Sequence, residues 1–235
     1  MERTSISHES LAHTALLRDL PKDRIQALNQ RCRWRTYEAD EFVIEHQDNS
    51  RDLHFLTRGS VRVVLFGKSG QEVLFRTMQE GQQLGELAAI DGKPRSATIV
   101  AITRATIGTM PQSVFLELLA AEPEIALKIC RHLTAMVRSL TERVLEFSTL
   151  KVKYRIYAEL LRLSADRSRP DNTAVISPPP AHAELASRIS THREAVTREL
   201  NDLSRAGLLE KRRGALEIRD VRRLLAMLEE ASVEG

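Results

Sequence analysis

The chain of 235 residues has little cysteine, no long apolar run and a net charge of only +3. Its two cysteines, Cys32 and Cys130, are too few and too far apart for a disulfide framework or a CxxC metal site, which favours a reducing compartment. No apolar run approaches the length that spans a bilayer, and the first residues lack the charged-then-apolar pattern of a signal peptide. We therefore expect a cytoplasmic protein that does not enter a membrane.

The sequence also lacks the motifs of catalysis. We find no nucleophile–base pair, no P-loop and no metal-ligand spacing, so the sequence predicts a non-enzyme with no catalytic or metal-binding residues. The hydrophobic content of 42% is enough to build real cores in one large or two ordinary domains.

The most informative segment runs from Gly85 to Thr98 and reads GELAAIDGKPRSAT. Gly85 lets the backbone approach a ligand closely, and the residues after it can open a short helix whose free N–H groups face an anion. Arg95 and Ser96 follow one loop later, and these groups together can hold one phosphate. Glu86 is unfavourable there unless its carboxylate accepts hydrogen bonds from a neutral part of the ligand, such as a ribose hydroxyl. The segment therefore predicts a sugar phosphate with one compact charge.

This segment resembles the phosphate-binding cassette of cyclic-nucleotide-binding domains, in the form carried by the cAMP receptor protein group of bacterial CRP/FNR regulators. The resemblance implies that Gly85 and Glu86 contact the phosphate and the ribose 2′-hydroxyl, while Arg95 and Ser96 hold the phosphate. The other residues that it places at the nucleotide are Val63, Leu87, Ala97, Leu140 and Thr141. The family often has a Thr-Ser pair at the last two of these positions, so Leu140 removes one polar contact with the purine. Selection of adenine over guanine therefore stays open.

Around the cassette, apolar and polar residues follow a period of two in short runs separated by glycines, which predicts a β jelly roll or barrel. The runs are 41–45, 53–57, 60–66, 71–77 and 98–106. The stretch from Leu53 to Val61 also resembles the early strands of the cyclic-nucleotide fold. Ahead of the runs, leucines at helical spacing over 10–33 predict two helices, with Pro21 as the first residue of the second.

A long helix is predicted from Pro123, because apolar residues recur after it at steps of three and four. They are Ile129, Leu133, Met136, Leu140, Val144 and Phe147. Part of this apolar stripe can pack on the jelly roll of its own chain. A helix of this length with polar residues on both sides of the stripe favours a second copy of itself, in a two-fold dimer. The resemblance implies the same, since regulators of this family dimerise through this helix.

The excess positive charge lies in the C-terminal third, where residues 151–235 hold 16 of the 35 Lys and Arg and 13 of the 32 Asp and Glu. Helical spacing over 149–164 predicts one helix, and two shorter helices with a tight turn are predicted over 181–209, as in a helix-turn-helix. The residues at the start of the second short helix that point away from its buried face are Arg193, Glu194, Thr197 and Arg198, and His192 of the preceding turn is a further candidate for DNA contact. Arginine can pair with guanine and glutamate with cytosine in the major groove.

The pattern R-E-x-x-x-R that begins at Arg193 resembles the base-reading trio of the same regulator family, with His192 where close relatives usually have serine. Residues 208–218 predict a two-stranded wing after this helix. Lys211 and Arg212 lie at its basic tip, where they suit DNA phosphate. The helix pair, the trio and the wing together predict a DNA-binding domain.

These features predict an α+β protein in three parts. Residues 1–121 form a cyclic-nucleotide-binding jelly roll with N-terminal helices, 122–150 a dimerisation helix and hinge, and 151–235 a winged helix-turn-helix domain that ends in a helix over 221–230. The resemblance implies a homodimeric, cAMP-responsive transcription regulator that binds a palindromic promoter site in double-stranded DNA. RNA polymerase is its expected further partner.

Other interpretations stay open. The ligand can include cGMP, or the same fold can act without a ligand, although such regulators usually lose the Glu/Arg pair that is present here. A haem or redox sensor would need an axial ligand or a cysteine cluster, and His46 and His54 are isolated histidines in predicted strands, which are usually hydrogen-bonded or exposed. The cassette can also be the regulatory module of an enzyme or channel, but no residues remain for a catalytic domain or a membrane span.

Overall fold

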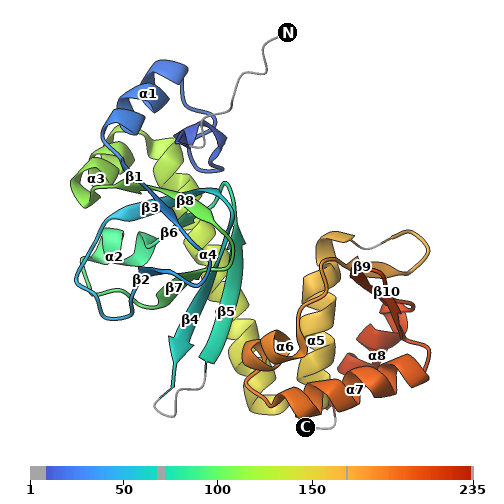
Figure 1. Ribbon diagram of the computed structural model, residues 1–235. Coiled ribbons are helices and arrows are strands. Elements are labelled where there is room, and N and C mark those ends of the chain that lie inside the picture. Colours follow the sequence, from blue (N-terminus) through green and yellow to red (C-terminus); the bar gives the residue numbers. More distant parts are fainter. Residues whose placement is uncertain (1–8, 68–71, 168, 234–235) are drawn as a thin grey trace. The chain divides into compact units, whose positions relative to one another are not determined.

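The computed structural model of the chain describes residues 9–67, 72–167 and 169–233 and divides into two compact units, Met1–Ala135 and Met136–Gly235 (Figure 1). Helix α4 (Pro123–Thr149) is continuous and contributes residues to both units. In the described ranges, no helix is long and apolar enough to cross a membrane.

The first unit contains two four-stranded antiparallel sheets. One has the strand order β1-β8-β3-β6, formed by Arg33–Tyr37, Ala105–Met110, Leu53–Arg58 and Gln83–Leu84. The other has the order β2-β7-β4-β5, formed by Phe42–Ile44, Thr98–Ala101, Ser60–Phe66 and Glu72–Gln79. Leu56 and Ile107 of the first sheet share one buried cluster with Val61 and Ile99 of the second. The jelly-roll prediction is therefore confirmed.

Helical segments before and after the sheets close one side of this core. They are η1 (Leu11–His13), α1 (Lys22–Gln30), α3 (Gln112–Ala121) and the first turns of α4. Leu11, Phe115 and Ile129 are buried in the cluster that these segments share with β3. Pro21 is the N-cap of α1 rather than its first helical residue, and η1 is a single 3-10 turn rather than the first of two full helices.

The predicted strand 98–106 is wrong in one respect, because the structure divides it into two strands in different sheets. β7 ends at Ala101 and β8 begins at Ala105, so the intervening residues carry the chain from one sheet to the other. Gly59 lies against this crossing with a φ of +86°, and a Cβ there would be 2.3 Å from the carbonyl oxygen of Arg104. Gln71, the first residue of the predicted run 71–77, lies outside the described residues.

The second unit combines helices with a three-stranded antiparallel sheet of order β10-β11-β9. Its helices are α5 (Val152–Ser164), η2 (Ala165–Arg167), α6 (His182–Arg188), α7 (Arg193–Arg205) and α8 (Val221–Val233), and its strands are β9 (Ala174–Ile176), β10 (Leu209–Arg212) and β11 (Ala215–Ile218). Leu160, Val196 and Leu224 meet in one buried cluster. The α6–α7 pair followed by the β10–β11 hairpin confirms the predicted winged helix-turn-helix.

Candidate functional site

The predicted phosphate cassette forms the short helix α2 (Glu86–Asp91), which has a glycine in the left-handed region at each end. Gly85 has a φ of +82° and Gly92 a φ of +70°. A Cβ on Gly85 would lie 2.4 Å from Arg95 Nη1, whereas the nearest atom to a Cβ on Gly92 is 3.8 Å away. Position 85 therefore requires glycine for its conformation and also for the space that Arg95 occupies.

Arg95 is the central cation of the cassette and is only 2% exposed. Its Nε donates to Ser50 Oγ at 3.0 Å, and its Nη1 donates to the Gly85 carbonyl at 3.1 Å. Its Nη2 donates to the Asp52 carbonyl at 2.8 Å and to His54 Nε2 at 3.2 Å. A guanidinium has five N–H donors, so one N–H of Nη1 is left without a partner among the described residues. All four acceptors are uncharged.

His54 acts in this arrangement as a neutral ring. Burial lowers the pKa of His54 to about 3, with further contributions from Arg95 and Arg33. Its Nδ1 lies 3.0 Å from Thr109 Oγ1, and its Nε2 accepts from Arg95. The tautomer with its proton on Nδ1 satisfies both contacts. A histidine that can suggest a haem or metal ligand in the sequence is thus an acceptor for the cassette arginine.

Glu86 begins α2 and is 2% exposed. Its Oε1 lies 3.5 Å from Arg76 Nη2 and 3.4 Å from His132 Nε2, while its Oε2 is buried with no hydrogen-bond partner in the described part of the chain. Burial raises the pKa of the Glu86 carboxyl, but His132, its own backbone N–H and Arg76 together outweigh burial and hold this pKa below its usual value. The carboxylate is therefore ionised at neutral pH and has one oxygen free to accept from a ligand.

Arg76 and His132 were not predicted as site residues, because they lie on β5 and α4 rather than in the cassette. The other residues predicted at the nucleotide in the first unit are exposed or half-buried, and they are Val63, Leu87, Ser96 and Ala97. Leu140 and Thr141 lie on the part of α4 that belongs to the second unit, where Thr141 Oγ1 donates to the Val137 carbonyl at 3.0 Å. Their contact with a ligand stays a prediction.

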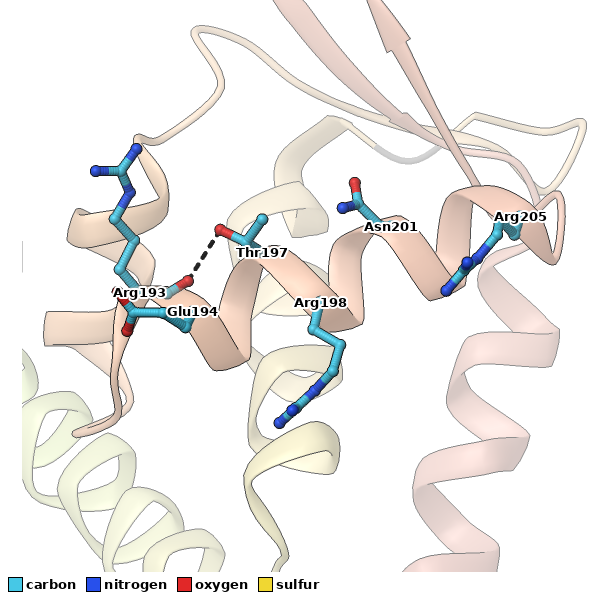
Figure 2. A pocket seen from close by; sticks show the side chains of 6 residues that line it. All are labelled: Arg193, Glu194, Thr197, Arg198, Asn201 and Arg205. Carbon is cyan, nitrogen blue, oxygen red and sulfur yellow. Dashed lines mark hydrogen bonds between the residues drawn. The ribbon is translucent and has the colours of Figure 1, made fainter.

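The predicted base-reading residues gather on one face of α7. Figure 2 shows a surface concavity that is lined by Arg193, Glu194, Thr197, Arg198, Asn201 and Arg205. Asn201 and Arg205 were not predicted, although they continue the four-residue spacing that begins at Arg193. Arg205 pairs with Asp202. Arg193, Glu194 and Arg198 form no ion pair with any described residue, so their charges are available to a partner.

One side-chain hydrogen bond ties α7 to α6. Thr197 Oγ1 donates to the Arg193 carbonyl at 3.0 Å, as Figure 2 shows, and lies 2.7 Å from Nδ1 of His182, the first residue of α6. His192 is the exposed N-cap of α7. The opposite face of α7 is fixed in the core by Val196, which is fully buried. The helix therefore presents one anchored face and one open face.

The two basic residues predicted at the tip of the wing differ in their surroundings. Arg212 Nε lies 2.7 Å from Glu217 Oε2, and its Nη2 lies 3.6 Å from a carboxylate oxygen of Glu210. Lys211 is exposed and has no ion pair within the described ranges. Lys211 is thus the more available of the two for a phosphate.

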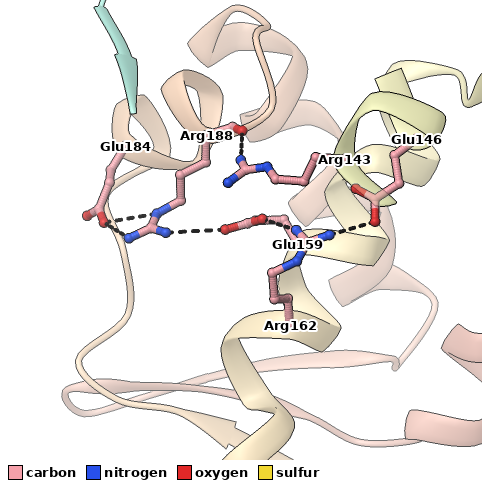
Figure 3. A network of polar contacts seen from close by, with 6 residues as sticks. All are labelled: Arg143, Glu146, Glu159, Arg162, Glu184 and Arg188. Carbon is pink, nitrogen blue, oxygen red and sulfur yellow. Dashed lines mark hydrogen bonds and ion pairs between the residues drawn. The ribbon is translucent and has the colours of Figure 1, made fainter. Parts of the chain in front are cut away.

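Six charged side chains join the end of α4 to α5 and α6 (Figure 3). They are Arg143, Glu146, Glu159, Arg162, Glu184 and Arg188. Three are positive and three negative, so the network is neutral as a whole.

Glu159 on α5 is the centre of this network and is 1% exposed. It pairs with Arg162 and lies 3.4 Å from Arg188 Nη1. Arg162 Nη2 reaches Glu146 Oε1 at 2.6 Å, and Arg143 donates to the Arg188 carbonyl. The last turns of α4 are therefore held to the first helix of the helix-turn-helix by buried charge.

Two family models match this chain. The cyclic nucleotide-binding domain matches residues 34–122, and the Crp-like helix-turn-helix domain matches residues 154–227. The first match contains the cassette. The second match contains the charged residues of the network that lie on α5 and α6, and it also contains the open face of α7.

Two relatives and one solved structure are similar to this chain over most of its length. The cAMP-activated global transcriptional regulator CRP of Salmonella typhimurium is 24% identical over 182 residues, which cover 76% of this chain and 85% of that protein. The cAMP-activated global transcriptional regulator Vfr of Pseudomonas aeruginosa is 25% identical over 207 residues, which cover 85% of this chain and 93% of that protein. The structure of the c-di-GMP responsive global regulator CLP of Xanthomonas campestris matches 80% of this chain and 94% of its own, with a TM-score of 0.66 at 21% identity.

We predict that Gly85→Ala lowers the free energy of unfolding by more than Gly92→Ala does. Both substitutions force an alanine into the left-handed region, which costs about 1–2 kcal/mol. Only the first also drives a methyl group into Arg95, which adds about 1–3 kcal/mol. Urea unfolding followed by circular dichroism measures the difference, and equal losses in the two variants would contradict the close packing at position 85.

We also predict that Glu159→Gln lowers the free energy of unfolding by about 3–5 kcal/mol, because it leaves two arginines without their buried carboxylate. Glu142→Gln on the exposed side of α4 is the matched control and should change the free energy by less than about 0.5 kcal/mol. The same unfolding measurement applies. A loss below about 1 kcal/mol for Glu159→Gln would show that the network does not stabilise the second unit.

Proposed function

The chain belongs to the CRP/FNR family of transcription regulators, and on that premise we propose that it is a homodimer that binds cAMP in the cassette and then a palindromic promoter site in double-stranded DNA. RNA polymerase is its partner at the promoter in this proposal. The observation that carries the proposal is the pair of unsatisfied groups in the cassette. Arg95 has one free N–H on a buried cation, and Glu86 has one free oxygen on a buried carboxylate.

A cyclic nucleotide matches these two groups in chemistry. Its single phosphate charge suits a buried guanidinium whose four existing acceptors are neutral, and its ribose 2′-hydroxyl can donate to the free oxygen of Glu86. Ser96 is exposed directly after Arg95 and can add a hydroxyl donor to the same phosphate. A ligand that offered only an anion, with no hydroxyl donor, would be repelled by the negative charge of the Glu86 carboxylate.

Dimerisation through α4 is supported by where its apolar side chains lie. Ile125 and Ile129 are buried in the core cluster of the first unit and Leu133 packs against it, but three apolar residues further along α4 are open. Val137 is 62% exposed, Leu140 45% and Val144 65%, at the three- and four-residue spacing of a helix-packing seam. A second copy of the same helix would cover this seam with matching side chains.

The mechanism follows from how the second unit is tied together. The charge network holds the end of α4 to α6, and the contact between His182 and Thr197 holds α6 to α7. Nucleotide binding that orders α4 in the dimer would therefore also orient α7. Two α7 helices in a two-fold dimer would then lie about 34 Å apart, one turn of DNA, and enter successive major grooves.

We predict that calorimetric titration detects cAMP binding at micromolar concentrations and that Ser96→Ala weakens it by about tenfold, because a hydrogen bond to the charged phosphate is lost. Lys93→Ala, which changes an exposed residue of the same loop outside the predicted contacts, is the matched control and should bind as the unmodified chain does. Binding of cGMP in parallel would show that Leu140 has removed the purine selection. No heat with either nucleotide would overturn the ligand assignment and leave a regulator with another ligand or none.

For the DNA interface, we predict that Arg193→Ala and Lys211→Ala fail in different ways. Arg193→Ala should lose about 1–3 kcal/mol of discrimination between the specific site and scrambled DNA. Lys211→Ala should weaken both complexes alike and reduce the slope of log affinity against log salt by about one. Fluorescence anisotropy at several salt concentrations separates the two effects. Equal losses on both DNAs for both variants would refute this division of roles.

A further inference from the structure

His132 contacts Glu86 of the cassette but lies outside the segment that carries the cassette. His132 is on α4, 46 residues after Glu86, and its Nε2 is buried 3.4 Å from Glu86 Oε1 without the alignment of a hydrogen bond. Ile129 is buried one turn before it, and Leu133 packs against the same core cluster. The backbone of α4 at this point is therefore anchored, and the His132 ring has a fixed approach to the carboxylate.

Two groups approach the same oxygen of Glu86 and leave the other oxygen open. Arg76 Nη2 on β5 lies 3.5 Å from Oε1 and His132 Nε2 on α4 lies 3.4 Å from it, whereas Oε2 is buried and has no hydrogen-bond partner among the described residues. Both contacts are made to Oε1, so they favour one orientation of the carboxylate. The open oxygen is therefore presented in one direction to any donor that enters.

The other basic residue on this face of α4 does not compete for Glu86. Lys128 is one turn before His132 on α4. Its Nζ lies 2.7 Å from Asp19 Oδ2 and donates to the Leu16 carbonyl at 3.4 Å. His132 and Lys128 both border a cavity between the N-terminal segment, β5, β6 and α4.

We propose that His132 is a positioning residue for the nucleotide ribose, holding the Glu86 carboxylate so that Oε2 accepts the 2′-hydroxyl. This inference rests on the proposed cyclic-nucleotide function. It makes the selectivity for a ribose over a deoxyribose depend on a residue of α4 that makes no hydrogen bond to the ligand. It also links the helix of the proposed dimer, through Glu86, to the sugar of the nucleotide.

The test compares cAMP with 2′-deoxy-cAMP in calorimetric titrations of the full chain. The variants are His132→Leu and His132→Met, which remove the ring nitrogen, and His132→Gln, which keeps a donor at similar reach. Arg131→Leu places the same new side chain on the exposed neighbouring position of α4 and is the matched control. The readout is the ratio of the two affinities, which a general loss of folding or of phosphate binding does not change.

We expect the unmodified chain, Arg131→Leu and His132→Gln to prefer cAMP by about tenfold, the effect of one hydrogen bond to a charged group. His132→Leu and His132→Met should lower this preference to less than about threefold by weakening cAMP and sparing 2′-deoxy-cAMP. An unchanged ratio in both, or equal weakening of both nucleotides, would overturn the role of His132 while the cyclic-nucleotide function stands. Failure of the unmodified chain to bind either nucleotide would instead overturn the proposed function, and the inference with it.

Discussion

The buried guanidinium of Arg95 is the constraint on which the rest of the ligand site depends. It fastens the loop at Ser50 and Asp52, the strand at His54 and the turn at Gly85 to one another. Each of these acceptors is neutral, so the positive charge is solvated by dipoles but not balanced by an ion pair with any described residue. Burial of such a charge is costly unless a partner of opposite sign arrives. An anionic ligand therefore binds to a site whose cation is already in place.

The cassette and the recognition helix could be predicted because each is local. Gly85, Glu86 and Arg95 lie within eleven residues, and the open face of α7 follows from helical spacing alone. What the sequence did not reveal depends on long-range pairing. His132 meets Glu86 only after α4 has packed on the sheets, and the switch between sheets after Ala101 depends on the corner at Gly59 rather than on any break in the apolar pattern. Strand β1, with its sequence RWRTY, shows too little alternation to be recognised.

The charge network in the second unit explains how a polar contact can determine an orientation. Glu159 is too deeply buried to be solvated by water, so any packing of α4 and α6 that leaves it unpaired is disfavoured. Apolar side chains alone would tolerate several packings of similar energy. Here Arg188 of α6 and Arg162 of α5 both pair with Glu159. The end of the proposed dimer helix is therefore held to the first helix of the helix-turn-helix by hydrogen bonds and ion pairs.

The two left-handed glycines at the ends of α2 also limit how this site can change in evolution. Gly85 and Gly92 set the length of α2 at six residues, and Arg95 fits against the first of them. An inserted or deleted residue between them would rotate the helix and separate Glu86 from its partners. Exposed positions such as Leu87 and Ile90 can change side chain at little structural cost. New ligand preferences in this protein should thus arise by substitution within a fixed length, and homologues are best aligned here on the spacing of the two glycines.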